Sequence, residues 1–188
     1  RYDELYAFGY WSFCRFLGYF ALPALVVVLM PGERLAAYGL SVRGFLKHLW
    51  IYGVLFAIVL PAVIAVSFTH DFSTYYPFYR SASRSWHDLL LWEAVYGLQF
   101  LSLEFFFRGF LLSALKPSMG AYSIFAMVVP YCMIHFGKPF LECLAAIVAG
   151  TVLGTLALKT RSIWCGVLIH VTVAVSMDVA ALLQTVGL

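Results

Sequence analysis

Residues 49–68, LWIYGVLFAIVLPAVIAVSF, run without a single charged side chain. A membrane-spanning helix needs about 20 mostly apolar residues to cross the hydrocarbon core of a bilayer. The apolar residues here are continuous, whereas a strand of a membrane barrel alternates apolar and polar positions. This stretch therefore predicts a transmembrane helix and places the protein in a membrane.

Further apolar runs surround it, at residues 6–30, 89–115, 120–134, 140–158 and 163–188. Of the 188 residues, 63% are hydrophobic and 11% are charged, and the mean hydropathy is +0.91. A water-soluble protein of this composition would expose large apolar patches. We therefore predict an all-α integral membrane bundle of about six transmembrane helices, forming a single domain over residues 1–188 with the lipid bilayer around it.

The charged residues argue against a nucleic-acid partner. The net charge is only +3, and the 12 lysines and arginines are scattered between the apolar runs. Nucleic-acid binding needs a basic stripe or patch, which this distribution lacks. Because the chain begins without a methionine, we also expect that an N-terminal segment is missing from this sequence. The oligomeric state is not indicated.

Two glycines predict a close helix contact. Gly150 and Gly154 form a GxxxG pattern within residues 140–158. Small residues at this spacing let two membrane helices approach closely. The pattern supports packing and carries no further function.

Four ionisable side chains are candidates for catalysis: Glu104 and Arg108 within residues 89–115, His135 at the end of residues 120–134, and His170. Such groups cost about 2.5–3.5 kcal/mol each at membrane depth on insertion scales, so they mark functional sites. A carboxylate near two imidazoles can activate water, and the imidazoles can stabilise an oxyanion or hold a metal. The alternative for Glu104 and Arg108, spaced i and i+4, is an ion pair that only orients the helix.

Two other acidic residues could support such a site. Asp178 lies about two turns after His170, where it either supports the site or ends the helix. Glu142 falls in the first turn of the helix expected at residues 140–158. The helix dipole favours a carboxylate at that position, which is the simpler interpretation.

The pattern of these residues resembles the CPBP intramembrane proteases, also called the ABI family, which include the type II CAAX prenyl endopeptidases. The run Glu104–Gly109, EFFFRG, is similar to the first family motif, Glu-Glu-x-x-x-Arg. The run Tyr131–His135, YCMIH, is similar to the second, Phe-x-x-x-His. His170 takes the place of the histidine that begins the third motif, and residues 160–164 resemble the lead-in to its helix. The resemblance covers about residues 88–180, a family-like core.

This sequence departs from the family pattern at two positions. The first glutamate of the first motif, which usually activates the water, is Leu103 here. The asparagine or aspartate expected four residues after His170 is Ala174, and the nearest acid is Asp178. Either the chain belongs to a subgroup in which Glu104 does the work alone, which we favour, or it keeps the fold without catalysis.

The resemblance and the residues together predict an intramembrane endopeptidase that cleaves a membrane-anchored or lipidated protein or peptide. Glu104 would act as general base toward a water, Arg108 would keep it ionised, and His135 and His170 would stabilise the oxyanion. We expect no cofactor, because two histidines and one glutamate make a sparse zinc shell and no HExxH pattern is present. If a metal is bound, His135, His170 and Glu104 are its ligands.

Two other functions compete with the protease. A catalytically inactive membrane scaffold or bacteriocin-immunity-type protein of the same fold is favoured by Leu103. A small transporter would use the same polar residues as an ion relay, but the sequence shows none of the inverted repeats typical of that class. By resemblance, the expected location is the bacterial inner membrane, with the endoplasmic reticulum as the eukaryotic alternative.

Overall fold

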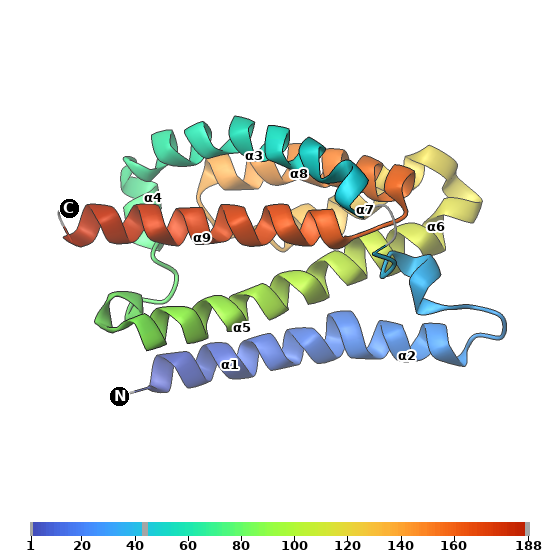
Figure 1. Ribbon diagram of the computed structural model, residues 1–188, viewed down its shortest axis with the longest axis horizontal. Helices are drawn as coiled ribbons and strands as arrows, with labels where there is room; N and C mark the ends of the chain where they lie inside the picture. Colours follow the sequence, from blue (N-terminus) through green and yellow to red (C-terminus); the bar gives the residue numbers. More distant parts are fainter. Residues whose placement is uncertain (1, 43–44, 187–188) are drawn as a thin grey trace.

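The computed structural model describes residues 2–42 and 45–186, and these residues form helices and connecting turns with no strand among them (Figure 1). The predicted all-α class is therefore confirmed. The ends of the predicted domain, residues 1, 187 and 188, lie outside the described residues, as does the end of the apolar run 163–188.

Nine α-helices and five shorter 3-10 or π-helical elements occur in the described residues. In chain order they are α1 (Asp3–Phe16), η1 (Leu17–Ala21), α2 (Leu22–Leu29), η2 (Leu35–Tyr38), α3 (Phe45–Ser67), α4 (His70–Tyr75), η3 (Ala82–Arg84), α5 (Trp86–Glu104), η4 (Phe105–Leu111), α6 (Leu112–Met119), η5 (Gly120–Tyr122), α7 (Ser123–Met133), α8 (Phe140–Thr160) and α9 (Trp164–Val186).

Five helical stretches of the described residues are long and apolar enough to cross a membrane, which confirms an integral membrane bundle. They are Asp3–Leu29, Phe45–Ser67, Trp86–Met133, Phe140–Thr160 and Trp164–Gln184. The third and fourth predicted spans both fall in the 48-residue stretch Trp86–Met133. Within it α5, η4 and α6 follow one another directly, and Gly120, with a φ of 56°, lies between α6 and α7, which pack against each other.

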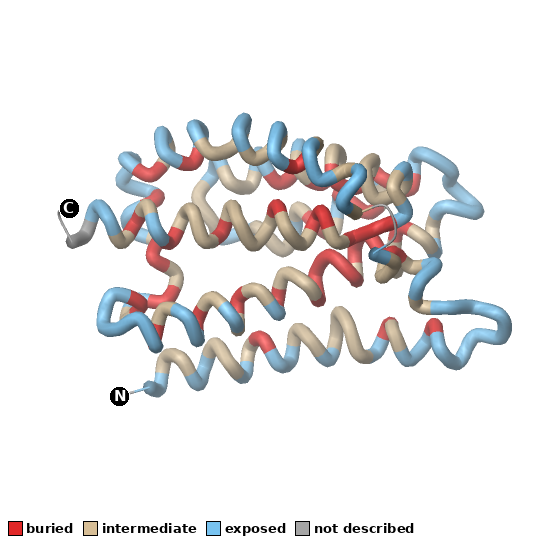
Figure 2. Tube along the Cα trace, viewed as in Figure 1, coloured by how far each residue is buried: buried red, intermediate tan, exposed pale blue. Residues whose placement is uncertain are grey.

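Helix α5 crosses the middle of the bundle and contacts α1 on one side and α9 on the other (Figure 1). Helix α3 packs on α9, and α7 packs on α8. Buried residues are concentrated along α5 and η4 (Figure 2), where Trp92, Phe105 and Phe107 are almost completely enclosed. The polar residues of this segment are therefore held at the centre of the bundle.

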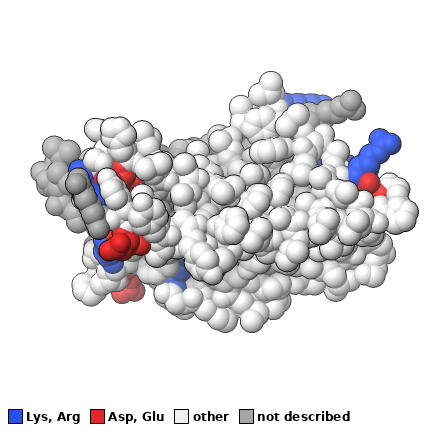
Figure 3. All heavy atoms as spheres, turned by 90° about the horizontal axis from the view of Figure 1, so that it is seen from below, with Lys and Arg blue, Asp and Glu red and all other residues white. Residues whose placement is uncertain are grey.

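The outer surface suits a lipid environment. Large apolar side chains such as Leu22, Val28, Ile58 and Val148 are exposed on the outer helices. On the face shown in Figure 3, lysine, arginine and acidic side chains lie mostly near the two ends, with a broad uncharged band between them. Hydrocarbon can cover this band without stranding a charge, which is the arrangement that a membrane protein requires.

The GxxxG glycines make the close contact that the sequence predicted. A Cβ atom on Gly150 would lie 3.0 Å from Cδ1 of Tyr131, and one on Gly154 would lie 2.8 Å from Cε of Met127. Helix α8 thus presents its smallest residues to α7, and Tyr131 packs directly against the backbone of α8. This contact helps to fix the position of Tyr131, which proves central to the site.

We expect Gly150→Leu to destabilise the bundle by about 1–3 kcal/mol, because the added side chain overpacks the contact with Tyr131. The measurement is thermal unfolding of the protein in detergent. Gly53→Leu, on α3, is the control, since a Cβ at Gly53 meets nothing within 4 Å. Equal losses for the two variants would contradict the assigned contact.

Candidate functional site

Glu104 and Arg108 form an ion pair that is sealed from solvent. Glu104 is the last residue of α5, and Arg108 lies in η4, a π-helical segment with a wider turn than an α-helix. Nη1 of Arg108 is 2.9 Å from Oε1 of Glu104, and both side chains are 0% exposed. Short π-helical segments often occur at functional sites. The pairing that the i, i+4 spacing suggested is therefore present.

His170 joins this pair from α9. Its Nδ1 lies 2.6 Å from Oε1 of Glu104, and its own side chain is 16% exposed. Neither this contact nor that of Arg108 has the angles of a directed hydrogen bond, and the positive charge that attracts the carboxylate is that of Arg108. A carboxylate oxygen only accepts protons, so the imidazole presents an N–H at Nδ1 to an ionised Glu104.

Tyr131, on α7, completes the cluster. Its hydroxyl lies 2.9 Å from Nε2 of His170, and it donates to that nitrogen when Nδ1 carries the ring proton. The guanidinium of Arg108 stands 3.9 Å from the centre of the Tyr131 ring, in cation–π contact. Glu104, His170 and Tyr131 thus form a carboxylate–imidazole–hydroxyl chain, a set of groups that enzymes use to move protons.

His135 lies on the other side of Tyr131 and does not meet Glu104 directly. It sits in the turn after α7, and its Nδ1 donates to the backbone oxygen of Tyr131 at 2.9 Å. Nε2 of the neutral ring is then an acceptor. Burial, with a smaller contribution from the charge of Lys138, lowers the pKa of His135 to about 4. The ring is therefore neutral near neutral pH.

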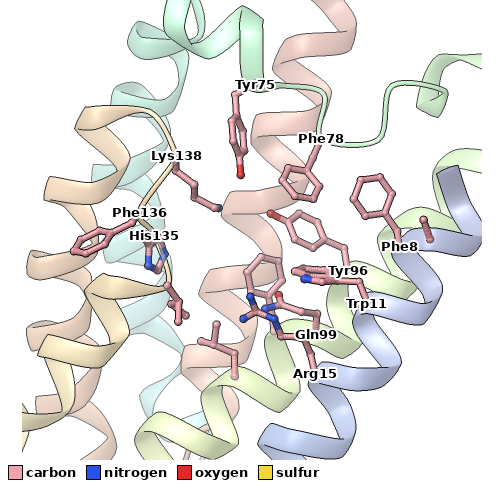
Figure 4. A pocket seen from close by; sticks show the side chains of 14 residues that line it. Phe8, Trp11, Arg15, Tyr75, Phe78, Tyr96, Gln99, His135, Phe136 and Lys138 are labelled. Atoms are coloured by element: carbon pink, nitrogen blue, oxygen red, sulfur yellow. The ribbon is translucent and has the colours of Figure 1, made fainter.

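A cavity of about 370 Å³ opens beside His135 (Figure 4). Its walls come from α1, from α5, from the segment around Tyr75 and Phe78, and from the turn that holds His135 and Lys138. Leu103 lines this cavity, whereas Glu104 does not. The position at which the related motif has its first glutamate therefore reaches the cavity wall, and the next position points into the protein.

Two glycines make room for the site. A Cβ on Gly166 would lie 2.9 Å from Cδ of Glu104, too close for any side chain. Gly166 is one turn before His170 on α9, so both residues lie on the same face of this helix. That face makes room for the Glu104 carboxylate at Gly166 and presents the imidazole to it at His170. A Cβ on Gly109 would lie 2.5 Å from the backbone oxygen of Tyr38, which explains why glycine follows Arg108.

Asp178 and Glu142 are not part of the buried cluster, and each contacts a residue that lines the cavity. Asp178 is fully buried on α9 and accepts from Nε1 of Trp92 at 2.7 Å and from the backbone N–H of Phe78 at 3.2 Å. Glu142 is in the first turn of α8, as expected. It accepts from the Tyr76 hydroxyl at 2.8 Å and from Nζ of Lys138 at 2.6 Å. These bonds hold the segments that carry the cavity residues Phe78 and Lys138.

The predicted residues thus come together only in part. Glu104, Arg108 and His170 are in direct contact, and His135 is linked to them through Tyr131. Sequence reasoning missed the Tyr131 hydroxyl and Gly166. The signal for Tyr131 was present, since it stands where the related motif has phenylalanine.

The residues named as possible zinc ligands do not fit a metal. Both nitrogens of His170 already have partners, Arg108 lies against Glu104, and Tyr131 separates His135 from them. Within the part of the chain that the structure describes, no three His, Cys, Asp or Glu residues are grouped to hold an ion. A cationic guanidinium on the carboxylate also opposes a second positive charge there.

We expect Gly166→Ala to destabilise the protein by about 1–3 kcal/mol, because the added methyl group must push the Glu104 carboxylate away from His170. The matched control is Gly97→Ala on α5, where the nearest atom to the new Cβ is 4.0 Å away. Thermal unfolding in detergent measures both. A Gly166→Ala protein as stable as the control would show that Glu104 has another position open to it.

The comparison with known families agrees with this geometry. The family described as "Type II CAAX prenyl endopeptidase Rce1-like" matches residues 85–176, close to half of the chain. The match includes Glu104, Arg108, His135 and His170 and excludes α1, α2 and α3. No curated protein and no solved structure matches the chain. The resemblance seen in the motifs is confirmed, since residues 85–176 match the type II CAAX prenyl endopeptidase Rce1-like family.

Proposed function

We propose that this protein is an intramembrane endopeptidase that hydrolyses a peptide bond in a membrane-anchored or lipidated protein or peptide. The observation that carries the proposal is the buried row of contacts from Glu104 to His170 to Tyr131. Glu104 and His170 match the related motifs, whereas Tyr131 stands where the motif has phenylalanine. It stands behind a cavity whose wall includes the other motif histidine, His135. A bacterial inner membrane is the location we propose.

The contacts favour a different division of roles from the one expected for Glu104. Because Oε1 of Glu104 is in contact with both Arg108 and His170, we propose that Glu104 acts through His170 and does not take a proton from water directly. His170 would be the proton acceptor, and Glu104 would stabilise the imidazolium against Nδ1, as a carboxylate does in acid–base triads. Arg108 would keep the carboxylate ionised.

Water would reach the site from the cavity side. The acceptor Nε2 of His135 would orient the water, whose proton passes to the Tyr131 oxygen as the Tyr131 proton passes to Nε2 of His170. The water oxygen bonds to the scissile carbonyl carbon, and collapse of the tetrahedral intermediate breaks the C–N bond. The proton held by His170 returns through Tyr131 to the leaving amine. Tyr131 would thereby help to activate the water, a role that the related motif gives to a glutamate at the position of Leu103.

We expect Tyr131→Phe to lower kcat by about 100-fold or more, the contribution typical of a proton-transfer group, while KM changes little. The variant has the residue of the related motif and removes one oxygen, so the fold is retained. The measurement is cleavage of a membrane-anchored peptide library by the protein in lipid nanodiscs, read by mass spectrometry. Tyr122→Phe, at an exposed position, is the control.

The second candidate is a membrane scaffold that keeps the fold without catalysis. Leu103 favours it, since an apolar side chain occupies the cavity wall where a carboxylate would activate water. The variant Leu103→Glu separates the two functions in the same assay. Cleavage by the natural protein, lost in Tyr131→Phe, supports the endopeptidase. Cleavage that occurs only after Leu103→Glu supports the scaffold and contradicts the proposed mechanism.

A further inference from the structure

A second cavity opens at the end of the bundle away from the start of α1 and the end of α9. The connector between α2 and α3, helix α6 and the turn between α8 and α9 all lie at this end (Figure 1). The cavity between these three segments has a volume of about 630 Å³. It shares no lining residue with the cavity beside His135, so it is a separate site.

Two basic side chains line this cavity, and no acidic side chain of the described residues lines it with them. Lys116 comes from α6, and Arg161 comes from the turn that follows α8. Both residues are exposed, and none of the ion pairs among the described residues includes either of them. Two positive charges are therefore available to a ligand.

The other polar residues of the wall add a hydroxyl group but no third charge. Arg108 is among the lining residues, yet its side chain is 0% exposed and pairs with Glu104. Its guanidinium is therefore not available to a ligand. Ser113 lies three residues before Lys116 on α6, so the two share one face of the helix. Two cations and a hydroxyl suit the oxygens of a phosphate group.

Arg161 has a backbone conformation that glycine adopts more easily. Its φ is 53°, in the left-handed region, at the position that ends α8. Residues other than glycine are uncommon there, because the Cβ atom crowds the backbone. Glycine would end the helix without this strain. What the arginine adds at this position is its charged side chain.

The walls of the cavity are joined without a ligand. The backbone N–H of Ile163 donates to the backbone oxygen of Gly39 at 3.0 Å, and Nε1 of Trp164 donates to the backbone oxygen of Leu40 at 3.1 Å. A Cβ atom on Gly39 would lie 2.7 Å from Cγ2 of Ile163, so the connector touches the start of α9 directly. Because the site is already formed, a ligand has little structure to order on binding.

The cavity lies at the level where membrane spans end. The span Phe140–Thr160 ends one residue before Arg161, and the span Trp164–Gln184 begins three residues after it. Arg161 is therefore at the boundary between the hydrocarbon core and the headgroups of the lipid. An anion that is held at this level by a membrane protein is most simply part of a lipid.

Arg15 is the contrasting case of an arginine in the middle of a span. It lies about 20 Å from either end of the span Asp3–Leu29, at 1.5 Å per residue, and it lines the other cavity. Its guanidinium carbon is 5.0 Å from the Trp11 ring centre and 5.3 Å from that of Tyr19. Lipid headgroups do not reach this depth, so a lipid phosphate is expected at Arg161 and not at Arg15.

We infer that the cavity between α6 and the two connectors binds the phosphate headgroup of an anionic phospholipid, with Lys116 and Arg161 as the residues that pair with it. Basic pockets between membrane helices are a recurring type of site for anionic headgroups. Apolar side chains of the wall, among them Ala37, Pro117 and Leu158, lie against the glycerol and the first acyl carbons. The inference goes beyond the proposed function and does not depend on it.

The test is native mass spectrometry of the full chain in detergent, titrated with phosphatidylglycerol or with phosphatidylcholine of the same acyl chains. Phosphatidylglycerol carries a net negative charge, whereas the choline group neutralises the phosphate of the other lipid. We expect the first phosphatidylglycerol to bind about tenfold more tightly, the effect of two basic side chains at a membrane surface. Replacing both residues, Lys116→Gln with Arg161→Gln, should abolish this preference.

A second variant and a control separate binding from folding and from surface charge. Arg161→Gly suits a φ of 53°, so in lipid-free detergent it should unfold at a temperature no lower than the natural protein, yet lose part of the preference. Lys159→Gln is the control, because Lys159 is an exposed lysine two residues from Arg161 and outside the cavity lining. It should keep the full preference.

Three results overturn the inference: equal binding of the two lipids, a preference that survives in the double variant, or an equal loss in Lys159→Gln. Inorganic phosphate distinguishes a lipid from a soluble anion. In lipid-free detergent, added phosphatidylglycerol should raise the unfolding temperature, and inorganic phosphate should not. Stabilisation by inorganic phosphate that is lost in the double variant would make this a site for a soluble anion, and the lipid assignment would be wrong.

Discussion

The centre of the bundle depends on one requirement, which is that a carboxylate and a guanidinium share a space that water does not reach. Removing either charge from such a pair leaves the other buried without compensation, at a cost of about 3–5 kcal/mol. Glu104 and Arg108 are on consecutive turns of one helical segment, so their pairing is local. The carboxylate in turn determines what α9 can present, namely Gly166 where the oxygens lie and His170 where a donor is needed. The second ring nitrogen of His170 in turn contacts the hydroxyl of Tyr131.

This arrangement explains how Leu103 and Tyr131, which both differ from the residues of the related motifs, fit in one site. The residue at 103 faces the cavity and the residue at 104 faces the interior, because neighbouring positions of a helix point about 100° apart. Leucine at 103 removes a carboxylate from the wall without disturbing the buried pair. Tyrosine at 131 adds a hydroxyl to the buried side. Of these two positions, only the buried one carries a polar group.

Much of the fold could be predicted from the sequence, because apolar runs of membrane length leave few alternatives to helices. The pairing of Glu104 with Arg108 and the close packing at Gly150 and Gly154 also followed from spacing along one helix. The orientation of the helices relative to one another could not be predicted from such spacing. Whether His135 faces Glu104 depends on how α7 is rotated about its axis, and Tyr131 occupies the face that turns toward His170. The sequence also predicted a break between the third and fourth spans at Lys116 and Pro117. In the structure α6 continues to Met119, and Gly120 follows it. The catalytic roles of the site residues stay predictions.

Arg15 also has a consequence for how the protein is made. Helix α1 leaves the ribosome before α5, which forms the facing wall of the cavity, so the charge meets the bilayer before its cavity exists. Trp11 and Tyr19 are each four positions from Arg15 and place their rings on its guanidinium. Two rings of the same helix thus partly replace water around the arginine. These cation–π contacts lessen the free-energy penalty of inserting the helix while the bundle is still incomplete. Biogenesis, and not only the finished site, therefore constrains the two aromatic residues beside this charge.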